Sequence, residues 1–162
     1  MAKALDQPSL YDTDYVAWLA EQVAHLRAGR LAALDVANVA DELEGLMKSD
    51  RRQLRNRLEV LIHHLLKWDG QPSRRSNRWR STVAEQRRRI RDLLRESPSL
   101  QREVEPMCKA VYSDALEAAA TETMLSPADF PGTLPYTVQQ IFERALPADE
   151  LPNPRAIRKN PE

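Results

Sequence analysis

The sequence predicts an all-α protein, a helical bundle of five or six helices. Leu, Ala, Arg and Glu are the commonest of its 162 residues, and each of them favours helix. The chain has only four glycines, and the alternation of β-branched and polar residues that is typical of strands is missing. Apolar residues recur instead at the three-to-four spacing of amphipathic helices.

The first expected helix covers about 13–28, and Gly29 can supply the left-handed residue after its end. A second begins after Asp35, and a third covers about 50–69. The spacing leaves open whether these two form one bent helix. The inner stripes of the first two helices are predicted to be Tyr15, Trp18, Leu19, Gln22, Val23 and Leu26, then Val36, Val39, Ala40, Leu43, Leu46 and Met47.

A short linker joins the third helix to a fourth over about 76–95, so the two should form a long antiparallel hairpin at the centre of the bundle. A fifth helix should run from 98 to about 123, bent or interrupted at Pro106, and a short sixth over about 137–145. We expect one helical domain over 1–146 and a Pro-rich, unstructured C-terminal tail over 147–162.

Composition also bounds the environment of the protein. The single cysteine, Cys108, excludes an intrachain disulfide and fits a reducing compartment. No apolar run reaches the ~18 residues of a membrane span, and the N-terminus lacks the apolar stretch of a secretory signal. These features predict a cytoplasmic protein that does not enter a membrane.

Charge is strongly segregated along the chain. The segment 51–95 holds 14 of the 24 Lys and Arg residues and only four acids, so it carries about +10, against about −5 on each side of it. Such a segment either pairs with acids of the same chain or offers a basic face to an anionic partner. The candidate acids are Asp41, Glu42 and Glu44 of the second helix and Glu103 and Glu105 of the fifth.

The fourth helix places most of its arginines on one stripe beside its apolar face. An arginine presents a planar fork of donors that matches phosphate oxygens. We therefore expect a non-catalytic domain that binds DNA or RNA through phosphate contacts, with Arg87 and Arg91 exposed. The candidate residues are Arg74, Arg75, Arg80, Arg87, Arg88 and Arg91. The alternative is a protein–protein interaction module or a self-associating structural protein, whose basic face pairs with an acidic partner or a second copy.

No catalytic or metal-binding pattern is present, so we expect neither an enzyme nor a cofactor. Cys108 lies on an apolar stripe, and the isolated glycines form no phosphate-binding loop. The spacings Glu21-x-x-x-His25 and Glu59-x-x-x-His63 are typical of ordinary surface pairs one helical turn apart.

Four residues around the hairpin are expected to support the fold. Trp68 and Trp79 should lie near its turn, His64 on a polar rim, and Gln86 inside the apolar face of the fourth helix. The buried amide of Gln86 needs partners, for which the linker backbone and the two indoles are candidates.

Several blocks of the chain together resemble a bacterial family. The most distinctive is His64-Leu-Leu-Lys-Trp68. The others include Tyr11-Asp-x-Asp-Tyr-x-x-Trp-Leu, Asp41-Glu-Leu-Glu, Arg75-Ser-x-Arg-Trp79, Gln86-Arg-Arg-Arg-Ile90, Glu122-Thr and Pro135-Tyr-Thr. Over about 11–146 they resemble the "domain of unknown function" family number twenty-nine. The resemblance implies a small, helical, single-domain bacterial protein, and it implies no activity.

Overall fold

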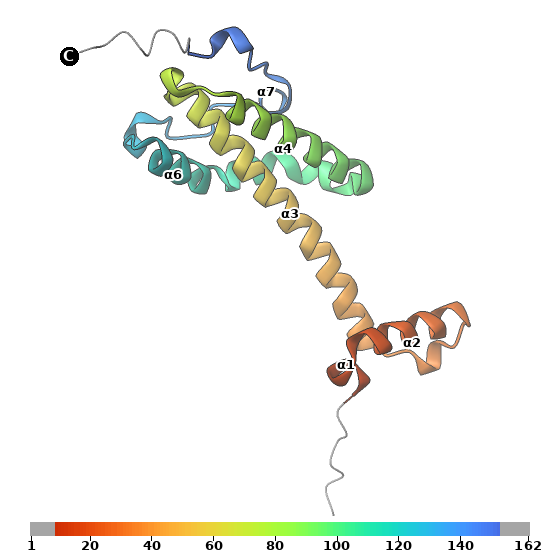
Figure 1. Cartoon of the computed structure of the whole chain (residues 1–162). Coiled ribbons are helices and arrows are strands. Elements are labelled where there is room, and N and C mark those ends of the chain that lie inside the picture. Colours follow the sequence, from red (N-terminus) through yellow and green to blue (C-terminus); the bar gives the residue numbers. More distant parts are fainter. Residues whose placement is uncertain (1–8, 153–162) are drawn as a thin grey trace, which may run out of the picture. The chain divides into compact units, whose positions relative to one another are not determined.

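The computed structural model describes residues 9–152 and contains seven α-helices and no strand in that range (Figure 1). The predicted all-α fold is confirmed. The helices are α1 (Leu10–Thr13), α2 (Tyr15–Arg27), α3 (Val36–Gly70), α4 (Asn77–Glu96), α5 (Val104–Ala110), α6 (Tyr112–Thr123) and α7 (Val138–Glu143). Short 3-10 turns cover Leu31–Ala33 (η1), Pro72–Arg74 (η2), Pro98–Glu103 (η3), Pro127–Asp129 (η4) and Ala148–Glu150 (η5).

The chain divides into two compact units, one ending at Ser49 and the other beginning at Asp50. The expected second and third helices are one continuous helix, α3, which contributes residues 36–49 to the first unit and 50–70 to the second. The two compact units do not show which parts of the chain fold independently. The single domain expected over 1–146 therefore stays a prediction. Within residues 9–152, no helix has both the length and the apolar composition needed to cross a bilayer.

The first unit contains α1, α2 and the beginning of α3. The expected helix over 13–28 is α2, which begins at Tyr15 because the Asp14 side chain caps it by accepting a hydrogen bond from the backbone N–H of Ala17. The short helix α1 before it was not predicted. Gly29 adopts the predicted left-handed backbone, with φ of 68°. In α2 only Trp18 and Gln22 are buried. The expectation that the other apolar residues of this helix point into a core is wrong.

The second unit contains the predicted long hairpin, which is confirmed. Ser76 caps α4 after the η2 turn, and α4 then returns alongside residues 54–70 of α3 (Figure 1). One core joins the two helices with α6 and α7, and its fully buried members include Leu58, Leu65, Val83 and Ile90.

The expected bend of the fifth helix at Pro106 is wrong. Pro106 lies in the first turn of α5, where a proline has no intrahelical hydrogen bond to lose. The interruption falls instead at Val111, between α5 and α6.

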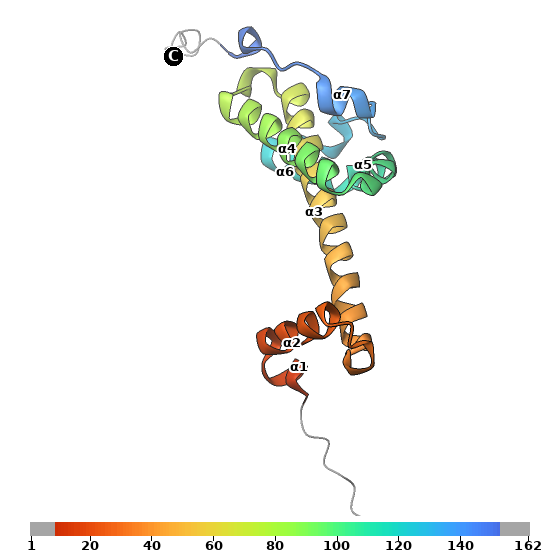
Figure 2. The ribbon, with the colours of Figure 1, turned by 90° about the vertical axis from the view of Figure 1, so that its right-hand side faces the viewer.

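The C-terminal part returns to the hairpin. Thr137 and Gln140 form a reciprocal capping box at the start of α7, and α7 lies beside α5 (Figure 2). Of the predicted tail 147–162, the first residues include η5, while 153–162 lie outside the described residues.

Candidate functional site

Half of the six arginines expected to contact phosphates are half-buried and bonded within the chain. These are Arg75, Arg80 and Arg87. Arg75 donates from Nε to the carbonyl oxygen of Trp68 at 2.8 Å and from Nη1 to the Glu150 carboxylate at 2.8 Å. Its guanidinium therefore stabilises the turn between α3 and α4.

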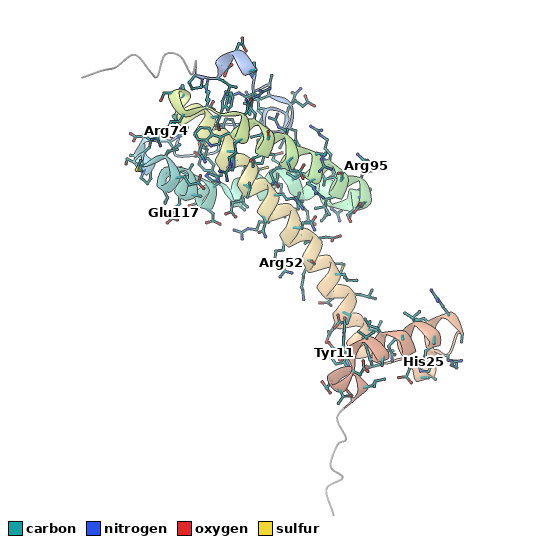
Figure 3. The ribbon with its side chains drawn as sticks, viewed as in Figure 1. Tyr11, His25, Arg52, Arg74, Arg95 and Glu117 are labelled. Carbon is teal, nitrogen blue, oxygen red and sulfur yellow. The ribbon has the colours of Figure 1, made fainter. Side chains whose placement is uncertain are left out.

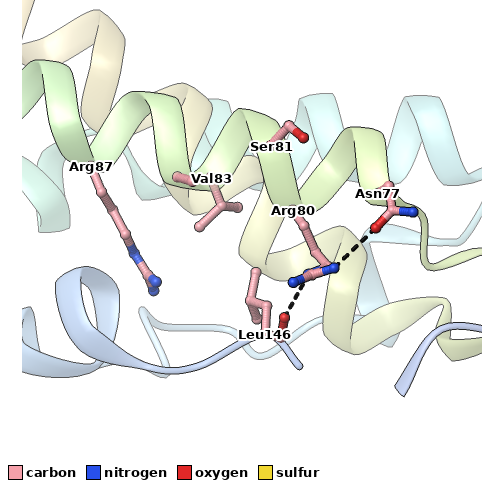
Figure 4. A pocket seen from close by; sticks show the side chains of 7 residues that line it. Asn77, Arg80, Ser81, Val83, Arg87 and Leu146 are labelled. Carbon is pink, nitrogen blue, oxygen red and sulfur yellow. Dashed lines mark hydrogen bonds between the residues drawn. The ribbon is translucent and has the colours of Figure 1, made fainter. Parts of the chain in front are cut away.

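Arg80 and Arg87 hold the C-terminal segment against α4 (Figure 4). Arg80 donates from Nε to the carbonyl oxygen of Leu146 at 2.8 Å, beside a cavity of about 300 Å³. Arg87 donates to the carbonyl oxygens of Ile141 and Arg144, both at 2.8 Å. Burial lowers the pKa of Arg87. The expectation that Arg87 is exposed is wrong, because carbonyls at the end of α7 satisfy its donors.

The other three of the six candidate arginines are exposed. Arg74 lies at the turn before α4 (Figure 3). Arg88 bonds Glu85 of the same helix at 2.7 Å and lies 3.5 Å from Asp92, while Arg91 is exposed and forms no ion pair within residues 9–152. The open part of the stripe is thus smaller than the sequence predicts.

Two of the acids proposed to neutralise the stripe, Glu42 and Glu44, have other partners. Glu42 accepts hydrogen bonds from the hydroxyls of Tyr11 and Tyr15, both at 2.7 Å, and the first of these bonds raises the pKa of Tyr11 to about 12. Glu44 pairs with Lys48 at 3.2 Å. These contacts keep both carboxylates within the first unit.

Acids of the C-terminal third neutralise part of the basic segment. Four pairs join a Lys or Arg of 51–95 to one of these acids more than 50 positions further along the chain, namely Arg51–Glu103, Arg55–Asp114, Lys67–Glu122 and Arg75–Glu150. The segregation of charge along the sequence is therefore used in part to join elements within the second unit.

The expected supporting role of the tryptophans agrees with their positions. Trp68 is fully buried and donates from Nε1 to Glu150 at 3.1 Å. Trp79 receives the Lys67 ammonium over its ring at 4.6 Å from the centroid. His64 is half-buried, with Nδ1 2.9 Å from the carbonyl oxygen of Val60.

The expected partners of Gln86 are wrong. Its Oε1 accepts a hydrogen bond from Nη1 of Arg57 at 3.4 Å, rather than contacting the linker backbone or an indole. Gln86 is half-buried, so the helical projection overstates its burial.

The buried His63 and Lys67 and the exposed Glu122 form a polar cluster that the sequence does not predict. Lys67 is buried and forms an ion pair with Glu122 of α6. His63 is also buried, and its Nε2 lies 3.5 Å from Glu122 without a hydrogen bond. His63 is therefore not the surface partner of Glu59 that the spacing indicates.

Burial lowers the pKa of His63 to about 4, so its imidazole is neutral at neutral pH. The hydrogen bond from Lys67 holds the pKa of Glu122 below its usual value. The block His64-Leu-Leu-Lys-Trp68 and the dipeptide Glu122-Thr were both visible in the sequence. Nothing in the spacing of these two motifs predicts that Lys67 contacts Glu122. Within residues 9–152, no group of three or more His, Cys, Asp or Glu residues is placed to hold a metal ion.

The first unit carries an apolar surface on its two long helical segments. We define the α2 stripe as Tyr15, Val16, Leu19, Val23 and Leu26. We define the α3 stripe as Val36, Leu43, Leu46 and Met47. Each of these residues is exposed, although on each helix they project within about 100° of one another. We call the two stripes together the N-terminal apolar face.

Exposed apolar residues are concentrated in this unit. Of the 12 exposed large apolar residues in the described part of the chain, 11 precede Ser49, and Met124 is the one that follows it. Monomeric proteins rarely gather this much exposed apolar surface in one part of the chain without a function for it. The N-terminal apolar face is therefore the strongest candidate for an interaction surface.

Comparison with known proteins finds one protein family. No curated protein and no solved structure matches the chain. The model of the family described as "Domain of unknown function DUF29" matches residues 10–146. The match covers most of the chain and includes both the hairpin and the N-terminal apolar face, and the chain therefore belongs to the DUF29 family.

Proposed function

We propose that this protein is a non-catalytic interaction module that binds a protein partner through its N-terminal apolar face. The observation that supports this proposal most is the concentration of 11 of the 12 exposed large apolar residues in the first unit. In the second unit the same kinds of residue form a closed core. This difference supports the proposal that a protein partner covers the exposed apolar residues of the first unit.

The sparse core of the first unit supports the same proposal. Among residues 9–49, Trp18 is the one buried apolar residue, and its ring packs against Tyr11 and Tyr15. Its other contacts are polar: Trp18 donates to Asp35 at 3.2 Å, and Gln22 accepts from the Asp35 backbone N–H at 2.8 Å. A segment of this size gains little stability from so few buried side chains. A partner that covers the two stripes would supply the missing apolar burial.

Replacing Leu46 by Glu tests whether the face is open in the free chain. Leu46 is 66% exposed, so Leu46→Glu should change the unfolding free energy of the dilute protein by less than about 0.5 kcal/mol. Leu61→Glu, at a fully buried position of the same helix, should prevent folding. Urea denaturation followed by circular dichroism measures both. A loss of more than about 2 kcal/mol for Leu46→Glu would show that the face is packed within the chain and would contradict the proposal.

A second candidate function is nucleic-acid binding by a reduced arginine set. Nine of the 14 basic residues of 51–95 are exposed. Exposed ion pairs such as Arg88–Glu85 contribute little, so phosphates can replace their carboxylates. The residues that support this proposal are Arg74, Arg78, Arg88 and Arg91, of which Arg78 is not in the predicted set.

Four phosphate contacts predict a moderate salt dependence. The logarithm of the affinity for duplex DNA should fall with the logarithm of salt concentration with a slope of about −3.5. Arg74→Glu combined with Arg91→Glu should remove most binding without loss of helical content, because both residues are exposed. Fluorescence anisotropy at low and moderate salt measures both effects. Absence of binding at low salt would exclude this second function.

We further propose that the protein acts in the bacterial cytoplasm. The single cysteine, which is buried and free, supports a reducing compartment such as the cytoplasm.

A further inference from the structure

We propose that the partner of the N-terminal apolar face is a second copy of this chain, docked about a two-fold axis with α2 antiparallel to its copy. This inference rests on the proposed function and names the occupant of the same surface. It is supported by the area of the face, by the distribution of charge along α2, and by the lack of matching apolar surface elsewhere in the described chain.

The area of the face suits a stable dimer. Its residues have between a third and three quarters of their surface open. The nine residues together expose on the order of 900 Å², comparable with the roughly 800 Å² that each partner contributes to a standard interface. Two such faces, each made of two helical segments, would pack as a four-helix arrangement with one shared apolar core.

The charges at the two ends of α2 complement each other under a two-fold rotation. Asp14 caps the helix and Asp12 lies in α1 just before it, while Arg27 and Arg30 lie at and just after its end. All four are exposed. An antiparallel copy places the basic end of one α2 beside the acidic end of the other, and it also opposes the two helix dipoles. A two-fold interface requires this kind of self-complementarity.

No other described surface of the chain matches the face. Among residues 50–152, Met124 is the one exposed large apolar residue. Contact with that surface would leave most of the two stripes against polar groups, whereas a second N-terminal apolar face would cover them with apolar side chains.

Sedimentation equilibrium of the full chain over a wide concentration range tests the inference. The expected result is a mass that rises from one copy to two. Leu19→Glu and Leu43→Glu, one in each stripe, should each hold the mass at one copy. Ala17→Glu is the matched control, because Ala17 is exposed on the same helix about 150° from the centre of the α2 stripe. It should leave the dimer intact. Circular dichroism verifies that each variant keeps its helices.

Two results would overturn the inference. One is a dimer that survives both Leu19→Glu and Leu43→Glu. The other is a mass of one copy at every concentration. In that case, binding of a hydrophobic fluorescent dye shows whether this inference fails alone or the proposed function fails with it. Dye binding that Leu19→Glu abolishes would mean that the face is open to a different protein, so that the inference alone fails. Absence of dye binding would mean that the face is covered in the monomer, so that both fail.

Discussion

Replacing Glu122 by Gln is expected to destabilise the protein by about 2 kcal/mol, because it removes the counter-charge of a buried lysine. The Lys67 side chain is only 7% exposed and pairs with Glu122 of α6. The Glu122 side chain is 52% exposed, so water offsets part of the loss, and the effect should be smaller than for a fully buried pair. Urea denaturation at neutral pH measures the change.

The matched experiment measures a double variant that carries both Lys67→Met and Glu122→Gln. Methionine removes the buried charge and keeps the apolar length that packs beside Trp79, so the double variant should return to within about 1 kcal/mol of the wild type. Glu117→Gln, at an exposed position of the same helix, should have no measurable effect. An equal loss from Glu117→Gln, or no recovery in the double variant, would show that the ion pair is not the cause.

Replacing Arg87 by Met is expected to cost about 3 kcal/mol. The carbonyl oxygens of Ile141 and Arg144 would lose a charged donor, and each unsatisfied buried group costs about 1–3 kcal/mol. The loss should be local at first, because these bonds hold the end of α7 against α4. Hydrogen exchange over 138–146 should therefore accelerate more than exchange over 54–66.

Arg91→Met is the control for Arg87→Met, since Arg91 is exposed one turn further along α4. It should change the unfolding free energy by less than about 0.5 kcal/mol. Similar effects of the two substitutions would mean that Arg87 is a surface residue and that its carbonyl contacts do not stabilise the fold.

The hairpin could be predicted because its information is local. The apolar stripe of residues 54–68 has the period of a helix, and Gly70, Pro72 and Ser76 mark its end and the start of α4. The continuity of α3 through Ser49 could not be predicted. Gly45 weakens a helix without ending it, and its Cβ position lies in open space, so no contact decides the conformation there.

The roles of the arginines could not be predicted, because a helical projection gives the direction of a side chain and not what lies opposite it. Arg87 and Arg91 project to the same side of α4. The segment that ends α7, more than 50 residues further along the chain, reaches Arg87. The pairing of Lys67 with Glu122 depends in the same way on the packing of α6 against α3.

The apolar stripes of α2 and α3 were predicted correctly as patterns and wrongly as a core. Periodicity shows that Leu19 and Leu43 belong to apolar faces, but it does not identify what covers them. The second unit has its own closed core, and the stripes remain exposed. An apolar face without a partner in its own unit is what a docking surface requires.

Self-cross-linking through a cysteine at position 19 tests the central claim most directly. Burial raises the pKa of the native Cys108 thiol to about 11 and makes this thiol unreactive. Any covalent dimer therefore forms through the introduced cysteine. Leu19 lies near the middle of the α2 stripe, where an antiparallel copy would bring position 19 close to its counterpart. Under mild oxidation, Leu19→Cys should form a covalent dimer much faster than Ala17→Cys. Equal rates for the two variants, or no covalent dimer from Leu19→Cys, would contradict the two-fold docking of the N-terminal apolar face.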